Sequence, residues 1–291
     1  MFHGVINIYK EPGFTSHDVV AKLRGILRQK KIGHTGTLDP AAEGVLPVCL
    51  GKGTKLCDLL TDKRKTYQAV LLLGTETDTQ DMTGTILSEK PTEQLTEPAV
   101  RGAAESFVGP YMQVPPMYSA LKVDGQKLYE IARRGGEVAR AARPITIGEL
   151  TVLGEADGDY VLRVRCSKGT YIRTLCHDIG AALGCGGVMS ALRRTEVGGY
   201  RVEDAHTMDE LCALPREAAQ RLLLSVDSLW PDALQVTVDA KAERLARCGN
   251  PFALSAPDGT YRIYAASGEF LLLAQVTDGT AVTIKSFFEV S

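Results

Sequence analysis

A single aspartate, Asp39, lies in a short segment whose neighbours restrict the backbone. The segment reads GHTGTLDP over residues 33–40, with two glycines before the aspartate and Pro40 directly after it. Glycine permits backbone angles that other residues avoid, whereas proline fixes its own φ and keeps the preceding residue out of the helical region. The pattern predicts a carboxylate on a stiff loop, as a nucleophile or general base requires. An aspartate that merely caps a turn would have the same local signature.

The elements that lead into this segment can be predicted from local patterns. Residues 5–10 alternate as a short strand, and the Pro-Gly pair after them marks a turn. Thr15 and Asp18 have the spacing of a capping box, and apolar residues then recur at helical spacing. We therefore expect a helix that runs to about Lys30 and delivers the chain into residues 33–40.

Further elements follow the same patterns later in the chain. Residues 66–74 and 160–166 are expected to be strands, and residues 91–105 a helix that begins after a proline. The residues SKGT at 167–170 are expected to form a turn after the second strand, and another helix follows this turn. The apolar face of that helix would consist of Ile172, Leu175, Cys176, Ile179 and Leu183.

Beyond Pro231 the pattern changes. A short helix that ends at Gly249 is followed by β-like runs at 260–266, 269–276 and 281–290. With the mixture of strands and helices upstream, this change predicts an α+β fold with a small β-rich C-terminal domain.

A long segment at residues 113–145 lies between the strands and helices predicted before it and those predicted after it. It is rich in proline, glycine and arginine, it contains Tyr118 and Tyr129, and it has one short helical stretch around residues 126–134. Excursions of this length are uncommon in compact domains and are usually functional or mobile.

The net charge of −2 hides an uneven distribution along the chain. Residues 22–31 and 163–173 carry only basic charges, whereas residues 203–232 carry seven acidic residues against two arginines. Phosphate binding depends on the local field rather than on the sum, so the basic clusters are candidates for binding a nucleic acid. Ordinary solvated surfaces would have the same composition.

Composition and motifs exclude several classes of protein. The 291 residues include 44% hydrophobic and 23% charged residues, and neither a secretory signal nor an apolar run near 18 residues is visible. Seven scattered cysteines without a C-x-x-C pair indicate free thiols in a reducing, cytoplasmic compartment. Residues 51–55, GKGTK, fail the phosphate-loop pattern, and no dinucleotide, serine-hydrolase or zinc-deaminase motif is present. We expect neither a cofactor nor a metal.

Four segments resemble, in order, the motifs of the TruB family of tRNA pseudouridine-55 synthases. The resemblance covers about residues 4–200, and the last 57 residues are only loosely similar to the small PUA-like RNA-binding domain of that family. The segments are the catalytic motif (33–55), the second motif (66–84), the RNA-gripping insertion (114–135) and the third motif (167–184 with SALRR at 190–194).

The resemblance implies a fold and a domain organisation. A pseudouridine synthase-like core, built on a mixed or antiparallel sheet with flanking helices, would occupy residues 1–232. This catalytic domain would contain the RNA-gripping insertion at about 113–145, and residues 233–291 would form the PUA-like domain.

By motif position, the resemblance also implies a set of site residues. Asp39 would be the nucleophile, Arg173 the arginine that pairs with it, and Tyr67 the tyrosine that stacks on a flipped base and helps to move a proton at the sugar. From the residues alone, Arg173 could equally be a surface arginine, and Tyr67 a core residue.

The remaining implied residues surround these three. Tyr171 and Leu192 would line the base pocket, His34 would fill the space that the base vacates, and Lys10 would support the loop. From the residues alone, Leu192 would be an ordinary core leucine.

The implied activity is isomerisation of uridine 55, in the T-loop of tRNA, to pseudouridine. Uracil detaches at N1, rotates and rejoins the ribose through C5, with attack by the aspartate either on ribose C1′ or on the base. The partner would be the tRNA T-arm, held by the basic helix and by an insertion that we expect to be poorly ordered without RNA. We expect a monomer that needs no membrane and no protein partner. The alternatives are a non-catalytic tRNA-folding chaperone, and a relative that acts on other RNAs or is guided by RNA and protein partners.

Overall fold

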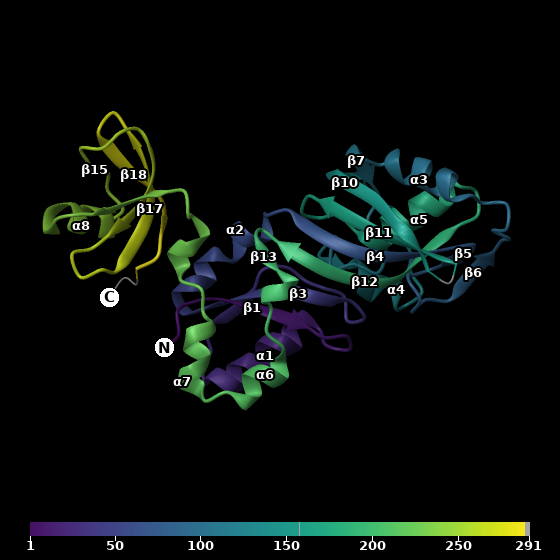
Figure 1. Ribbon diagram of the computed structural model, residues 1–291, viewed down its shortest axis with the longest axis horizontal. Coiled ribbons are helices and arrows are strands. Elements are labelled where there is room, and N and C mark those ends of the chain that lie inside the picture. The colour runs from purple at the N-terminus through teal and green to yellow at the C-terminus, as the bar shows by residue number, and fades with distance from the viewer. Residues whose placement is uncertain (157, 289–291) are drawn as a thin grey trace.

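The computed structural model describes residues 1–156 and 158–288, which are organised around a nine-stranded and a five-stranded sheet (Figure 1). The larger sheet has the order β1-β3-β12-β4-β11-β10-β7, with β2 paired to β3 and β13 to β12. All its neighbouring strands are antiparallel except β12 and β3, so the sheet, predicted as mixed or antiparallel, is mixed. The strands are β1 (Gly4–Lys10), β2 (Ile32–His34), β3 (Glu43–Leu50), β4 (Lys65–Leu73), β7 (Gly109–Gln113), β10 (Arg143–Ala156), β11 (Asp159–Cys166), β12 (Gly187–Val197) and β13 (Tyr200–Arg201).

Helix α1 (Ser16–Leu27) begins and ends where the local chemistry dictates. Its first turn is closed by the predicted capping box, in which Thr15 Oγ1 accepts from the Asp18 N–H and the Asp18 carboxylate accepts from the Thr15 N–H. The apolar face of α1 packs against β1 and β3 in one buried cluster. The helix ends before Lys30 because Arg28 adopts the left-handed conformation, with φ of 47°.

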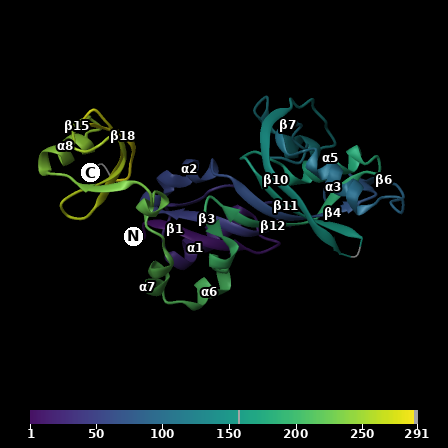
Figure 2. The ribbon, with the colours of Figure 1, turned by 45° about the horizontal axis from the view of Figure 1, so that its top comes forward.

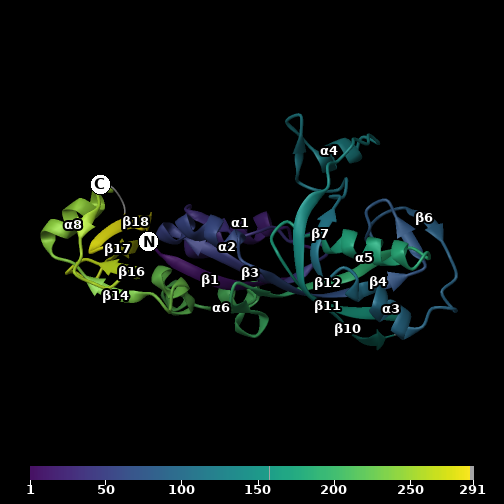
Figure 3. The same cartoon turned by 90° about the horizontal axis from the view of Figure 1, so that it is seen from above.

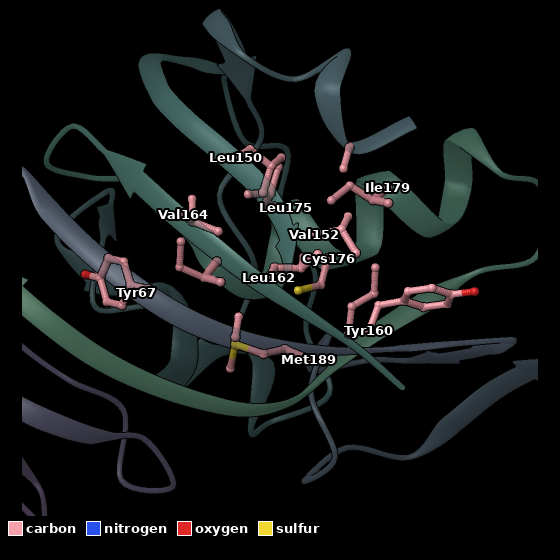
Figure 4. Close-up of a cluster of buried hydrophobic side chains, with 14 of the residues drawn as sticks. Tyr67, Leu150, Val152, Tyr160, Leu162, Val164, Leu175, Cys176, Ile179 and Met189 are labelled. Atoms are coloured by element: carbon pink, nitrogen blue, oxygen red, sulfur yellow. The ribbon is translucent and has the colours of Figure 1, made fainter. Parts of the chain in front are cut away.

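Helices α5 (Ile172–Ala182) and α3 (Glu97–Glu105) help to enclose a second core with β4, β10, β11 and β12 (Figure 4). The predicted apolar face of α5 is buried apart from Leu183, which lies just beyond the helix and is partly exposed. α3 is shorter than the predicted 91–105, because Thr96 caps it and accepts a hydrogen bond from Ala99.

The long excursion leaves the sheet between two paired strands. Gln113 of β7 lies opposite Arg143 of β10, so the chain returns to the point from which it departs. Between them lie β8 (Lys122–Val123), β9 (Gln126–Lys127) and α4 (Leu128–Ala132), the last within the predicted 126–134. Figure 3 shows this segment projecting away from the sheet, and a separate hairpin of β5 (Thr75–Thr77) and β6 (Ile86–Glu89) follows β4.

Short helices that were not predicted from the sequence pack near the cluster formed by α1, β1 and β3. α6 and α7 lie next to α1 (Figure 2), and the chain around them bridges back to β1 at Val5↔Leu224 and Ile8↔His206. The short elements are η1 (Gly51–Leu56), α2 (Cys57–Thr61), η2 (Val202–Asp204), α6 (Met208–Ala213), α7 (Arg216–Ala219), η3 (Gln220–Leu222) and η4 (Val226–Leu229).

The five-stranded sheet lies at the C-terminal end, in the order β14-β16-β17-β18-β15, and α8 (Ala240–Arg247) packs on it. The three predicted runs are its central strands, although the end of the last run lies outside the described residues. Two strands were missed, β14 and β15. The strands are β14 (Leu234–Thr237), β15 (Phe252–Ala253), β16 (Gly259–Tyr264), β17 (Phe270–Thr277) and β18 (Thr280–Ser286).

Contacts join this sheet to the rest of the protein. Lys52 Nζ lies 2.6 Å from Glu269 Oε1, and Trp230 packs against the rings of Phe270 and Phe287. Among the described residues, no helix has the length and apolar character that a membrane crossing needs.

Candidate active site

An ion pair between Asp39 and Arg173 marks the site. Arg173 Nε lies 3.1 Å from Asp39 Oδ2, although the two residues come from the loop after β2 and from the first turn of α5. The arginine side chain is only 6% exposed, whereas the aspartate side chain is 43% exposed. The buried arginine therefore holds the carboxylate, which remains accessible to a ligand on its exposed side.

Arg173 also contacts groups that hold it in place. Its Nη1 lies 3.4 Å from Asp81 Oδ2 and donates to the Thr79 carbonyl at 3.2 Å, while Nη2 donates to the Tyr118 carbonyl at 3.0 Å. Asp81 in turn accepts from the side chains of Thr79 and Thr83. Asp81 was not predicted as a site residue, although it lies within the second motif at 66–84.

The loop at residues 33–40 is hydrogen-bonded along its length. Thr35 Oγ1 donates to the Pro47 carbonyl at 3.1 Å, the Leu38 N–H donates to Ser16 Oγ at 3.0 Å, and the Pro40 carbonyl accepts from Gly13 at 2.9 Å. These bonds join the loop to β3, to α1 and to the turn after β1. The loop is therefore held by several elements.

The two glycines of this loop act differently. Gly36 has φ of +139°, a conformation that favours glycine. Gly33 lies in β2, and a Cβ there would meet Cys57 Sγ at 3.2 Å. Gly33 is thus favoured by close packing rather than by a positive φ, which corrects the interpretation from sequence.

Lys10 is a fully buried lysine beneath the loop. Its Nζ donates to the carbonyls of Glu11 at 3.0 Å, Phe14 at 2.6 Å and Pro40 at 3.2 Å, and the residue is 0% exposed. Burial lowers the pKa of Lys10 to about 8. One ammonium group therefore joins the end of β1 both to the turn that follows it and to Pro40, the residue after Asp39.

Tyr67 enters the site from β4 and is also buried. Burial raises the pKa of Tyr67 to about 12, an effect that the neighbouring Arg194 opposes and the Asp39 charge adds to. In Figure 4 the Tyr67 hydroxyl points away from the aliphatic side chains of the core cluster. The phenol ring thus closes one end of that core, with its polar end toward the site.

The other predicted site residues lie around these groups. Tyr171 is half-buried at the start of α5, where its backbone exchanges hydrogen bonds of 2.8 and 3.0 Å with the buried Gln113 side chain. Burial raises the pKa of Tyr171, and the charge of Asp39 contributes, which places both groups in one electrostatic environment. Leu192 lies opposite Ala69 in the β12–β4 pair and packs on the core.

His34 lies at the beginning of the loop. Its ring meets His17 edge-on with centroids 5.1 Å apart, and its Nδ1 accepts from the Gly36 N–H at 3.3 Å. Burial lowers the pKa of His34, and the nearby His17 lowers it further, so the neutral ring is favoured. A neutral, partly exposed ring at this point is suited to stacking contacts.

Within residues 1–156 and 158–288, no cluster of three or more histidine, cysteine, aspartate or glutamate side chains has an arrangement that could hold a metal ion.

Two family models match the chain. The TruB family pseudouridylate synthase N-terminal domain matches residues 24–172, and the tRNA pseudouridylate synthase B C-terminal domain matches residues 173–230. The protein belongs to the TruB family of pseudouridylate synthases. The resemblance drawn from the four motifs is therefore confirmed, and this TruB family member is an enzyme.

Individual relatives agree with this assignment. This TruB family member is 50% identical over 225 residues to tRNA pseudouridine synthase B of Alkaliphilus oremlandii, which covers 77% of this chain and 74% of that protein. It is 51% identical over 258 residues to the protein of the same name from Lachnoclostridium phytofermentans, covering 85% and 83% of the two chains.

Solved structures extend the likeness to nearly the whole chain. A chain of an H/ACA RNP bound to a substrate RNA containing 2′-deoxyuridine matches with a TM-score of 0.71 at 26% identity, over 99% of this chain and 86% of that one. A chain of a Cbf5-Nop10-Gar1 complex matches with a TM-score of 0.72 at 28% identity, over 98% and 85%. The predicted α+β pseudouridine synthase-like fold is thus confirmed.

Proposed function

We propose that this protein converts uridine 55, in the T-loop of tRNA, to pseudouridine, with Asp39 as the nucleophile. Two bacterial relatives that carry the name tRNA pseudouridine synthase B share 50% and 51% of aligned residues with it. The matched chains of the H/ACA RNP and the Cbf5-Nop10-Gar1 complex share 26% and 28%. The higher identity favours a tRNA substrate over an assembly with other proteins.

The reaction exchanges one glycosidic bond for another within a single nucleotide. The bond from ribose C1′ to N1 of uracil breaks, the base rotates in the pocket, and a bond from C1′ to C5 forms. The proton at C5 is lost and N1 regains a proton, so that the exchange is redox-neutral. The protein must supply a nucleophile, a pocket that retains the detached base, and a path for one proton.

The Asp39–Arg173 pair is the observation that carries this proposal. A covalent intermediate through the carboxylate, formed either at C1′ or on the base, divides the exchange into two easier steps. Such a carboxylate must be placed in advance, and Asp39 is held by Arg173 at 3.1 Å on a loop that other elements hydrogen-bond. Its 43% exposed side chain remains within reach of a nucleotide.

The surrounding side chains can receive a base that has left its stack. Extruding a nucleotide costs a few kcal/mol, which contacts in the pocket must offset. We assign Tyr67 to stacking on the uracil and to proton transfer at the sugar, and Tyr171 and Leu192 to the walls of the pocket. His34, at the entrance, occupies the space from which the base came, while Lys10 supports the loop from beneath.

The proposal includes how the RNA is held. The basic stretch 22–31 and the insertion at about 113–145 contact phosphates of the T-arm, and the insertion becomes ordered against the RNA. The catalytic domain comprises residues 1–232 and the C-terminal RNA-binding domain residues 233–291. The enzyme acts as a cytoplasmic monomer without an obligatory protein partner.

Tritium release from tRNA that carries [5-³H]uridine tests the proposal. The label leaves C5 only when a carbon–carbon glycosidic bond forms there. Release should require both Asp39 and the uridine at position 55, and should be lost with Asp39→Ala and with a transcript that has cytidine at that position. Binding of the tRNA by the intact protein without tritium release would instead establish a T-arm chaperone.

A further inference from the structure

Arg194 is a fully buried arginine beneath the candidate active site. It is 1% exposed and lies in β12, where its register partners are Tyr67 on β4 and Gly44 on β3. A Cβ at Gly44 would lie only 2.2 Å from the Arg194 carbonyl oxygen, so β3 and β12 approach closely at this point. Arg194 therefore occupies the place where three strands of the large sheet meet the Asp39 loop.

The guanidinium of Arg194 contacts the backbone that leads to Asp39. Its Nε donates to the Val45 carbonyl at 2.7 Å, and its two terminal nitrogens reach the carbonyls of Thr37 and Gly36, each at 3.5 Å. Thr37 and Gly36 immediately precede Leu38 and the nucleophile in the chain. The arginine thus connects the loop to β3.

Arg194 is also the register partner of Tyr67 across β12 and β4, and its charge opposes the rise in the Tyr67 pKa. Arginine can only donate hydrogen bonds, so in a bond between these two side chains the Tyr67 oxygen is the acceptor. This leaves the hydroxyl proton of Tyr67 for another partner, and among the described residues no hydrogen bond donated by that hydroxyl is present. That proton is available to a bound nucleotide.

The cost of burying this charge argues for a role beyond packing. The described hydrogen-bond acceptors of Arg194 are three carbonyls, with no carboxylate among them. Burying a charge is expensive, and apolar residues of similar volume often replace buried charged groups without loss of stability. A methionine would fill the space more cheaply if packing were the only requirement.

We propose that Arg194 is a positioning residue that fixes the Tyr67 hydroxyl relative to Asp39, by holding the tyrosine oxygen and the Asp39 loop with one rigid guanidinium. This inference rests on the proposed function, because it assigns the Tyr67 proton to the reacting nucleotide. The planar fork of arginine holds several acceptors in one fixed geometry, whereas lysine provides a single flexible ammonium group. The charge alone is therefore insufficient, and lysine should not replace arginine here.

The test compares single-turnover tritium release and tRNA affinity for wild type, Arg194→Lys, Arg194→Gln, Tyr67→Phe and the double variant Arg194→Lys/Tyr67→Phe. We expect Arg194→Lys to slow release by about 10- to 100-fold, the size of effect that a small misplacement of reacting groups produces. Affinity for tRNA should change by less than about threefold, because Arg194 contacts no solvent-exposed surface. A matched control is Arg193→Lys, which alters the neighbouring arginine, 43% exposed beside Glu43, and should release tritium at the wild-type rate.

The double variant distinguishes positioning from general stabilisation. If Arg194 acts through Tyr67, its replacement should have little further effect once the hydroxyl is gone, so the two effects should be far from multiplicative. Multiplicative effects, or wild-type release by Arg194→Lys, would overturn the inference and leave the proposed function intact. Thermal melts accompany each variant, and if neither Arg194 variant folds, Arg194 is a folding residue and the inference is rejected. Absence of release by the wild type would instead refute the proposed function.

Discussion

The Asp39 loop and the insertion between β7 and β10 are held in opposite ways. The loop is eight residues long and is hydrogen-bonded from beneath by buried cations, Lys10 through Pro40 and Arg194 through Gly36 and Thr37. The insertion has two strands of two residues each and a helix of five, and residues 133–137 are exposed. Figure 3 shows it standing away from the sheet.

This difference suggests that one region carries out the reaction and the other binds the RNA. A nucleophile gains rate only when its position is set before the substrate arrives, so its loop must be held by the protein itself. A surface that folds around RNA can instead receive its final contacts from the ligand. Arg173 of α5 contacts both regions, because it pairs with Asp39 at 3.1 Å and donates to the Tyr118 carbonyl at 3.0 Å. Correct seating of the insertion is thereby linked to the arginine that pairs with Asp39.

The largest expected effect is that of Asp39→Asn. The amide keeps the shape of the side chain and leaves the backbone bonds of the loop intact, but removes the proposed nucleophile. Tritium release should fall by at least about 10⁴-fold, as when a covalent catalyst is deleted, while tRNA affinity stays within about threefold. Asp62→Asn, which changes an exposed carboxylate paired with Lys168, serves as the control. Substantial release by Asp39→Asn would remove the aspartate from the chemistry.

Arg173→Met should have the next largest effect. The methionine leaves Asp39 without its partner and Asp81 without the cation at 3.4 Å, so the carboxylate is no longer held in place. We expect single-turnover release to fall by about 10²- to 10³-fold. Arg173→Lys should recover part of this loss, because one ammonium group can still meet one carboxylate. Equal rates for the methionine and lysine variants would show that the pairing does not matter.

Loss of arginines from the insertion should weaken tRNA binding without changing the rate of the reaction. For the double variant Arg133→Ala/Arg134→Ala we expect about tenfold weaker tRNA binding and a salt dependence shallower by about one to two units of slope. Release at saturating enzyme should be unchanged. A control that removes two exposed arginines elsewhere, Arg201→Ala/Arg221→Ala, should bind as the wild type does. A slower saturated rate would contradict the division between RNA binding by the insertion and the reaction at the Asp39 loop.

The last prediction concerns stability rather than activity, and it tests the lysine beneath the loop through its pH dependence. Burial lowers the pKa of Lys10 from 10.5 to about 8, so between these values the unfolded chain binds more protons than the folded one. Stability therefore gains from Lys10 as the pH rises through this window, and below about pH 8 the cost of burying the charge is fully present. Relative to Lys10→Met, the unfolding free energy of the wild type should rise by about 3 kcal/mol across the window.

Urea titrations of both proteins between pH 7 and 10.5 measure this difference. Other groups that titrate there are common to the two chains and cancel in the comparison. Parallel curves would mean that the buried ammonium group does not titrate as its surroundings dictate.

Local patterns were sufficient for much of the fold. Alternation placed β1, β4 and β11, and the Thr15–Asp18 spacing placed the start of α1, because each signal lies within a few residues of chain. The boundaries failed where a single residue decided them, as when the left-handed conformation of Arg28 ended α1 early. The short helices at residues 202–229 were missed because they depend on packing against β1 and α1 rather than on their own periodicity.

By itself, the sequence determined the stiff setting of Asp39, the switch to a β-rich C-terminal region and, through its motifs, the family. Only the tertiary structure decided that Asp81 forms an ion pair with Arg173 and that Gly33 packs closely against Cys57. It also decided that Arg194 contacts the Asp39 loop and is the register partner of Tyr67. The physical reason is the nature of the partners. Arg194 is bound mainly by backbone carbonyls from other elements, and a carbonyl has no signature in the residue type that carries it. Such contacts exist only once the strands have been brought together.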